Sequence, residues 1–215
     1  MAAGNVTVLD RRHALVTGGG RGIGAAVAAA LNAQGMRVSL IGRTRETLQA
    51  TQTELGLTGG TFVADVTDEV AVNDAADAFR TEHGPIEVLV NNAGAAESAP
   101  FKATSRELCD RMVAVNLTGT YTVTRAVLSD ITKARAGRIV NVASTASLKG
   151  YAYVSAYTAA KHGVLGLTRA LALELAGTAA TVNAVCPGFT DTDLLSSSVE
   201  KIVEVSGRSQ EEARP

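Results

Sequence analysis

The chain has 215 residues, of which 46% are hydrophobic and 19% are charged, and its formal net charge is −1. This size and composition fit an ordinary globular fold with a sizeable core, so we expect one domain over residues 1–215. The near-neutral charge gives no electrostatic reason for binding nucleic acid or an anionic membrane surface, and neither partner is expected.

Short apolar runs alternate with longer helical patterns along the chain. The apolar runs predict strands at 14–16, 37–42, 60–66, 86–90, 138–143 and 181–185. The patterns between them predict helices at 24–35, 43–55 and 69–82, from 104–107 through Asn116 to about 134, and from about Tyr157 to 176. This alternation predicts an α/β fold with a doubly wound parallel sheet and helices on both faces.

A glycine-rich turn, TGGGRGIG at 17–24, joins the first strand to the first helix. Glycine allows positive φ and close backbone approach, and the helix start presents free N–H groups that suit a pyrophosphate. The strand-turn-helix context therefore predicts a dinucleotide site. Its expected contacts are Gly18, Gly20, Arg21, Gly22, Ile23 and Gly24.

The end of the second strand indicates which nucleotide is bound. NAD binders usually carry an acidic residue there, which accepts from the ribose 2′-OH. This chain has Gly42 and Arg43 instead, and Arg21 supplies a second cation. Two guanidinium groups suit a 2′-phosphate, so NADP(H) is the preferred cofactor. Glu46 lies slightly later and keeps NAD(H) as the alternative.

Seven motifs in order resemble the short-chain dehydrogenase/reductase family over residues 13–192. They are TGGGRGIG (17–24), Asp65-Val66, NNAG (91–94), Asn116, Ser144, YTAAK (157–161) and CPGFTDT (186–192). The resemblance implies a Rossmann-type fold and an NAD(P)-dependent oxidoreductase that interconverts a ketone and a secondary alcohol. It also implies the catalytic set Asn116, Ser144, Tyr157 and Lys161.

The resemblance implies a role for each catalytic residue. Tyr157 would exchange a proton with the substrate oxygen, and Ser144 would hold that oxygen. Lys161 would bind the nicotinamide ribose, and Asn116 would hold a water in a proton relay.

The spacing of Tyr157 and Lys161 has a physical reading of its own. They are four residues apart, so a helix places them on one face. A cation ~4 Å from the phenol offers about 4 kcal/mol at an effective dielectric near 20. That energy corresponds to a fall of about 3 in the pKa of tyrosine, so we expect Lys161 alone to bring this pKa near 7.

The resemblance also implies cofactor contacts at the other strand ends. Asp65 and Val66 would lie beside the adenine, and Asn92, Ala93 and Gly94 would line the cleft. Pro187 and Gly188 would turn the chain under the nicotinamide, with Thr190 and Thr192 near its carboxamide.

The sequence gives little information about which substrate the pocket accepts. Candidate positions, many of them small or apolar, are Ala95, Ala96, Ser147, Tyr151, Tyr153, Phe189 and Leu194. Within the family, the chain resembles reductases of 3-oxoacyl thioesters carried on acyl carrier protein or CoA, and 3-hydroxyacyl-CoA dehydrogenases. This implies a thioester substrate, while other secondary alcohols, sugars and sterols stay open.

The C-terminal region departs from the family pattern. Residues 192–215 resemble the segment over the substrate pocket, after which relatives add a helix and a seventh strand. We therefore expect the sheet to lack its last strand and to expose the strand at 181–185 as an edge. A homodimer or homotetramer is expected, and the helices carrying Asn116 and Tyr157 could form a dimer face.

Two other classes stay open: a non-catalytic NADP(H)-binding protein, and a sugar-nucleotide epimerase or dehydratase, which also uses the YxxxK pattern. The three histidines are scattered and the two cysteines lack metal-ligand spacing, so no metal is expected. The N-terminus has no apolar signal-peptide core and no run spans a membrane, so a cytoplasmic protein is expected.

Overall fold

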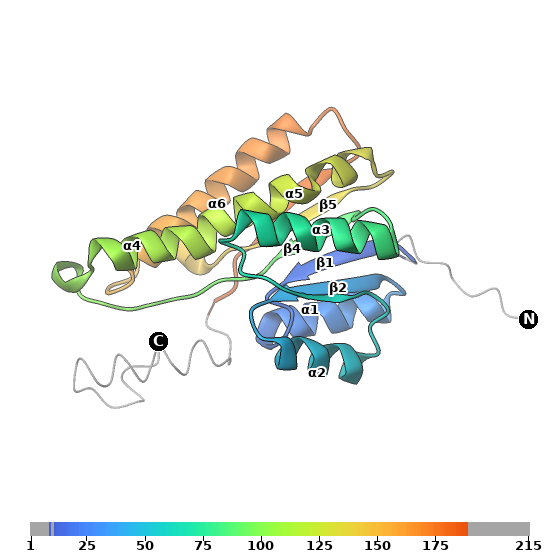
Figure 1. Cartoon of the computed structure of the whole chain (residues 1–215). Coiled ribbons are helices and arrows are strands. Elements are labelled where there is room, and N and C mark those ends of the chain that lie inside the picture. Colours follow the sequence, from blue (N-terminus) through green and yellow to red (C-terminus); the bar gives the residue numbers. More distant parts are fainter. Residues whose placement is uncertain (1–8, 10, 189–215) are drawn as a thin grey trace, which may run out of the picture.

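A parallel six-stranded sheet forms the centre of the molecule in the computed structural model, which describes residues 9 and 11–188 (Figure 1). The strand order is β3-β2-β1-β4-β5-β6, and every neighbouring pair is parallel. The strands are β1 (His13–Thr17), β2 (Arg37–Gly42), β3 (Thr61–Val63), β4 (Val88–Asn91), β5 (Arg138–Val142) and β6 (Thr181–Val185). The predicted doubly wound α/β architecture is confirmed.

Helices cover both faces of this sheet (Figure 1). Helices α1 and α2 lie on one face, and α3, α5 and α6 lie on the other. The helices are α1 (Gly22–Ala33), α2 (Arg45–Leu55), α3 (Glu69–His83), α4 (Arg106–Val113), α5 (Gly119–Lys133) and α6 (Ser155–Glu174).

Two apolar cores lie on opposite faces of the sheet. Leu15 of β1 packs into the core under α3 and α5, whereas its neighbours Ala14 and Val16 pack into the core under α1 and α2. All five residues of β1 are buried. A strand covered on both faces shows no alternation of polar and apolar residues, which is why the central strands read as continuous apolar runs.

The predicted helix through Asn116 is one helical run with a π-helical turn inside it. The turn, η2 (Ala114–Thr118), separates α4 from α5. A π turn adds one residue to a helical turn and occurs often at functional sites. Gly119 follows it at a close approach, since a Cβ there would lie 2.5 Å from Cγ2 of Val66.

Several boundaries differ from the predicted ones. The third strand ends at Val63 rather than at Val66, because Asp65 begins a turn in which its carbonyl accepts from Asp68 N. Helix α1 ends at Ala33, and Gly35 follows with a φ of 82°. Residues 192–215 and the expected lack of a seventh strand lie outside the described residues. Within the described part, β6 pairs with β5 alone.

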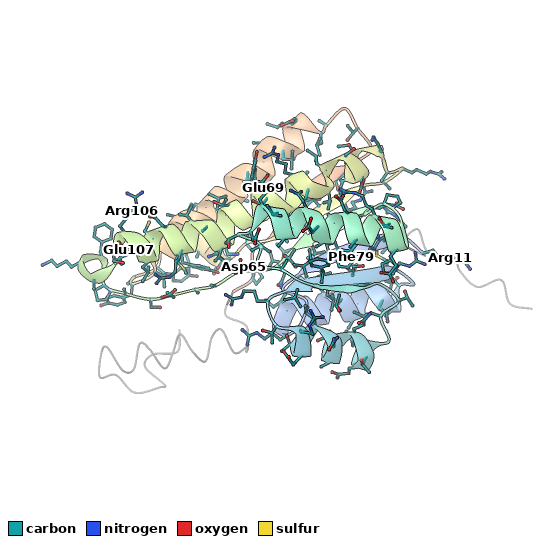
Figure 2. All side chains as sticks on the ribbon, viewed as in Figure 1. Arg11, Asp65, Glu69, Phe79, Arg106 and Glu107 are labelled. Atoms are coloured by element: carbon teal, nitrogen blue, oxygen red, sulfur yellow. The ribbon has the colours of Figure 1, made fainter. Side chains whose placement is uncertain are left out.

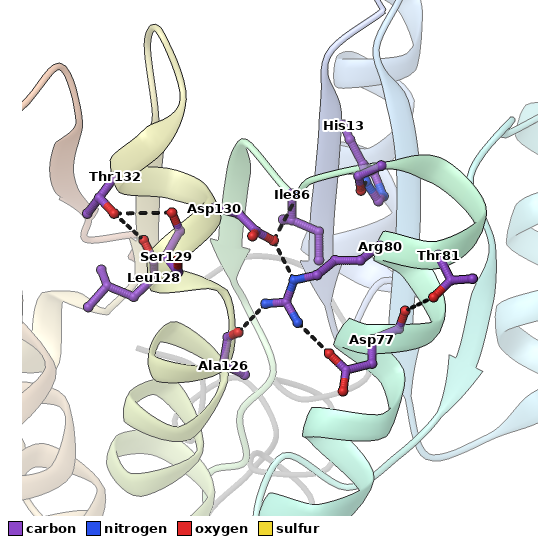
Figure 3. Close-up of polar contacts among 11 residues, drawn as sticks. His13, Asp77, Arg80, Thr81, Ile86, Ala126, Leu128, Ser129, Asp130 and Thr132 are labelled. Carbon is purple, nitrogen blue, oxygen red and sulfur yellow. Dashed lines mark hydrogen bonds and ion pairs between the residues drawn. The ribbon is translucent and has the colours of Figure 1, made fainter.

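Arg80 joins helices α3 and α5 near the start of β4 (Figure 3). Its Nε donates to Asp130 Oδ2 at 2.7 Å, and its other nitrogens bind Asp77, at 2.6 Å, and the carbonyl of Ala126. Asp130 Oδ2 also accepts from Ile86 N at 3.2 Å. This ion pair therefore ties two helices to the loop that leads into a central strand.

Candidate active site

The predicted site residues gather at the carboxyl edge of the sheet. Strands β1 and β4 are neighbours, and the chain winds in opposite directions from them, which makes this the switch point where such sheets bind ligands. Asp65 lies at this edge and Arg11 at the opposite one (Figure 2).

The glycine turn and the loop after β4 form one hydrogen-bonded frame. Thr17 Oγ1 accepts from Asn92 N and Ala93 N, both at 3.0 Å. Asn92 Nδ2 donates back to the carbonyls of Thr17, at 3.0 Å, and Gly18, at 3.2 Å. Gly18 has a φ of 64°, and a Cβ on Gly24 would clash with the Gly18 carbonyl oxygen. The structure therefore explains why glycine is needed at both positions.

The start of α1 is available for a phosphate. Its N-cap residue, Arg21, makes no side-chain capping hydrogen bond, and the first turn holds no acidic residue. Uncapped N–H groups at a helix start favour an anion, so this end fits the pyrophosphate of a dinucleotide.

The glycine turn lies against the start of α2. Thr51 Oγ1 donates to Gly20 O at 3.1 Å, and a Cβ on Gly20 would lie 2.7 Å from Thr47 Oγ1. Arg21 and Arg43 are both exposed, one in this turn and the other just before α2. These contacts place the two cations in neighbouring segments, as a 2′-phosphate site requires.

Asp65 and Val66 lie in the turn after β3. Asp65 Oδ1 accepts from Thr67 N at 2.9 Å and from Thr67 Oγ1 at 2.8 Å. Val66 is buried against Gly119. Their predicted contact with the adenine stays a prediction, and the structure assigns both residues a role in shaping this edge.

Ser144 and Tyr157 meet beyond the end of β5. Ser144 has extended backbone and caps the short 3₁₀ turn η3 (Thr145–Ser147), accepting from Ala146 N at 3.1 Å. Tyr157 lies in the first turn of α6, and its hydroxyl is close enough to the Ser144 side chain for Ser144 to lower its pKa. The predicted pair is therefore within reach of a single substrate oxygen.

Lys161 lies one turn further along α6 and is 5% exposed. Its Nζ donates to Val142 O at 2.8 Å and lies 5.8 Å from the ring centroid of Tyr157. Burial lowers the pKa of Lys161 to about 8, and the nearby Cys186 acts in the opposite direction.

The expected effect of Lys161 on Tyr157 is wrong in this arrangement. Burial raises the pKa of Tyr157 above its usual value, and the group that opposes this rise is Ser144, through its hydrogen bond. The physical reason is the order in which the two groups titrate. Because burial lowers the pKa of Lys161 to about 8, Lys161 has lost its proton before Tyr157 titrates, and it then places no positive charge beside the phenolate.

Asn116 is fully buried in the π turn. Its Nδ2 donates to Ala95 O at 2.9 Å and to Met112 O at 3.0 Å, and its Oδ1 accepts from Ala95 N at 3.3 Å. A Cβ on Gly94 would lie 2.8 Å from Asn116 Oδ1 and 3.6 Å from Lys161 Nζ. Asn116 and Lys161 thus converge on Gly94, while the relay role of Asn116 stays a prediction.

The loops beside the site hold the candidate pocket positions. Tyr151 OH donates to Thr145 Oγ1 at 2.9 Å, and Tyr153 has a φ of 68° with its carbonyl bound by Ala99 N at 2.7 Å. Ser147 is buried. Pro187 O accepts from Thr145 N at 2.9 Å, which brings the CPG turn beside Ser144. The predicted residues Phe189, Thr190, Thr192 and Leu194 lie outside the described residues.

Two contributors to this site were not predicted as site residues. Thr17 anchors the glycine turn to the β4 loop, and its only signal was its place at the start of the TGGGRGIG motif. The Val142 carbonyl binds Lys161, and a backbone acceptor leaves no signal in the side-chain pattern.

Two of the histidines predicted to be scattered lie together. The rings of His13 and His83 are 5.7 Å apart at the opposite edge of the sheet. Among the described residues, no three His, Cys, Asp or Glu side chains group as metal ligands would. The described helices also include none with the length and hydropathy needed to cross a bilayer.

Comparison with known proteins agrees with this geometry. The family model described as short chain dehydrogenase matches residues 12–202. Acetoacetyl-CoA reductase of Rhizobium meliloti (strain 1021) is 39% identical, over 89% of this chain and 79% of the relative. D-beta-hydroxybutyrate dehydrogenase of Cupriavidus necator is 38% identical, over 96% and 81%. A crystal structure of a variant actinorhodin polyketide ketoreductase with NADPH has a TM-score of 0.90 at 39% identity, over 96% and 81%. The chain therefore belongs to the short-chain dehydrogenase family and is an NAD(P)-dependent oxidoreductase acting on CH–OH groups.

Proposed function

We propose that the chain is an NADP(H)-dependent ketoreductase that interconverts a 3-oxoacyl thioester and the matching 3-hydroxyacyl thioester. The observation that carries the reaction type is the convergence of Ser144, Tyr157 and Lys161 beyond β5. Relatives named acetoacetyl-CoA reductase and polyketide ketoreductase support a thioester substrate on CoA or acyl carrier protein.

The residues of the chain fit the chemistry of carbonyl reduction. NADPH, when bound, supplies the hydride. Ser144 and Tyr157 hold the carbonyl oxygen from two directions, and Tyr157 donates the proton that this oxygen takes up. Lys161 is fixed on Val142 one helical turn away, in reach of the nicotinamide ribose in the family's arrangement. Asn116 holds the backbone of Ala95, in the loop after β4, through two hydrogen bonds.

The cofactor preference follows from the edge of the sheet near β2. Strand β2 ends in Gly42 without a carboxylate, and Arg21 and Arg43 lie on neighbouring segments beside the glycine turn. A 2′-phosphate supplies the charge that these guanidinium groups favour. The NADPH of the actinorhodin ketoreductase structure supports the same choice.

Another secondary alcohol, a sugar or a sterol is the alternative substrate. A non-catalytic NADP(H)-binding protein is the alternative class, and the contacts among Ser144, Tyr157 and Lys161 favour catalysis over it. We also infer a single domain, cytoplasmic, in a homodimer or homotetramer.

A binding titration followed by an activity assay tests the proposal. Nicotinamide fluorescence should show saturable binding of NADPH and much weaker binding of NADH. The complex should then reduce acetoacetyl-CoA, and Tyr157→Phe should abolish turnover while NADPH binding persists. A preference for NADH would overturn the cofactor assignment, and turnover by Tyr157→Phe would overturn the role of Tyr157.

A further inference from the structure

A buried hydrogen-bonded network lies between the sheet and helices α5 and α6, behind the site. Its side chains are Asn91 of β4, Asn141 of β5, Thr124 of α5 and Thr168 of α6, each at most 5% exposed. Asn91 and Asn141 are register partners in the parallel pair β4–β5. The network therefore crosses two central strands and links them to α6, which carries Tyr157 and Lys161, and to α5, which follows the π turn that holds Asn116.

The two threonines fix the direction of every bond in the network. Thr124 Oγ1 donates to Thr120 O and Thr168 Oγ1 donates to Val164 O, both at 2.7 Å. Each hydroxyl has one proton, so each can only accept from the strand that it faces. The amide of Asn141 must therefore present its nitrogen to Thr168.

The strand asparagines complete this chain. Asn141 Nδ2 donates to Thr168 Oγ1 at 2.8 Å, and Asn141 Oδ1 accepts from Asn91 Nδ2 at 2.9 Å. Asn91 Nδ2 gives its second hydrogen to Thr124 Oγ1 at 2.9 Å. Flipping either amide would set donor against donor or acceptor against acceptor, so the network has one arrangement.

Helix α6 is consequently held on β5 at two adjacent residues of the strand. The side chain of Asn141 binds Thr168, and the carbonyl of Val142 binds Lys161. Lys161 and Thr168 are about two helical turns apart on one side of α6. The hydrophobic effect is non-directional, whereas two directional hydrogen bonds at separate points specify where the helix lies along and around its axis.

We propose that Asn141 and Thr168 are positioning residues, which hold α6 so that Lys161 lies on the Val142 carbonyl beside Tyr157. The proposal rests on the function proposed above for Lys161. Neither residue contacts the reacting groups, and both act through the position of the helix.

Four variants test this assignment. Thr168→Val keeps the shape of the side chain but removes the acceptor for Asn141. Thr168→Ala removes the same acceptor and leaves room for a water, so it serves as the second variant if Thr168→Val does not fold. Thr168→Ser keeps the acceptor and should rescue. Ile131→Val is the control, because it removes one methylene from a buried α5 side chain outside the network. Far below each melting temperature, Thr168→Val and Thr168→Ala should lower kcat about tenfold, and they should also raise the KM for NADPH because Lys161 moves away from the nicotinamide ribose.

A second readout does not depend on turnover. In protein carrying ¹³Cε-lysine, the Lys161 signal can be assigned by its loss in Lys161→Arg and titrated with pH. Loss of the Thr168 anchor should free the ammonium from its buried position, so its midpoint should rise by at least about 0.5 toward that of free lysine. Thr168→Ser and Ile131→Val should match the wild type.

The outcomes separate the proposal from a purely structural role. If Thr168→Val and Thr168→Ala lose thermal stability but keep the wild-type kcat and Lys161 midpoint, the network only stabilises the fold and the proposal is overturned. If the wild type itself fails to reduce acetoacetyl-CoA, the proposed function fails, and the Lys161 titration still decides the positioning role.

Discussion

Removing the carboxylate of Asp130 should destabilise the protein much more than removing that of Asp77, although both bind Arg80. The Asp130 side chain is 14% exposed, whereas that of Asp77 is 74% exposed. Asp130→Ala removes a hydrogen bond to a charged group, worth about 1.5–3 kcal/mol, and leaves Ile86 N without its partner at a further cost of about 1 kcal/mol. We therefore expect a loss of about 3 kcal/mol of unfolding free energy.

The matched variant Asp77→Ala removes an exposed pair, which contributes about 0–1 kcal/mol. For a chain of this size, 1 kcal/mol corresponds to about 2–4 °C in Tm, so Asp130→Ala should lower Tm by about 6–12 °C and Asp77→Ala by no more than about 4 °C. Differential scanning calorimetry of both variants measures this. Equal shifts would refute the argument that burial decides the strength of the two pairs.

Two further predictions concern glycines and a buried histidine. Gly24→Ala should weaken NADPH binding at least about tenfold, because its Cβ would clash with the Gly18 carbonyl. The matched variant Gly166→Ala, in α6, places a Cβ that meets nothing within 4 Å. It should raise the free energy of unfolding in urea by about 0.5–1 kcal/mol. Burial lowers the pKa of His13 below 6.5 despite its bond to Gly84 O. As the pH falls, the unfolded chain therefore takes up a proton on His13 at a higher pH than the folded chain does. The contribution of His13 to stability is full above pH 6.5 and is lost as the pH falls toward the folded pKa. Urea midpoints measured against pH should fall more steeply below pH 6.5 in the wild type than in His13→Gln.

The layout of the fold was predictable because its strands are buried on both faces. The run at 37–42 matches β2, and the motif residues fall at strand ends as the doubly wound pattern requires. The π turn around Asn116 was not predictable. A one-residue insertion between two amphipathic helices changes the apolar period too little to be seen over five residues.

Contacts between segments far apart in the chain could not be predicted from the sequence either. His13 and His83 are 70 residues apart in the chain and meet only because β1 begins where α3 ends. The partner of Lys161 is a backbone carbonyl, so its position depends on how α6 crosses β5 and on no residue type. Spacing showed that Tyr157 and Lys161 share a face, but it could not show where the ammonium points on that face.

The electrostatic state of Tyr157 leads to a prediction about the direction of catalysis. Because burial raises the pKa of Tyr157, the phenol is protonated at neutral pH and ready to donate its proton during reduction. Oxidation of the alcohol needs the phenolate, which the same burial disfavours. With one substrate pair, the rate of reduction should therefore stay nearly level from about pH 6 to about pH 7, below the pKa of about 8 at which Lys161 loses its charge, while the rate of oxidation should rise about tenfold over the same range. Initial rates in both directions across this range measure it. An oxidation rate that is already level near pH 7 would mean that a bound cofactor or substrate brings in enough positive charge to reverse the effect of burial on the Tyr157 pKa.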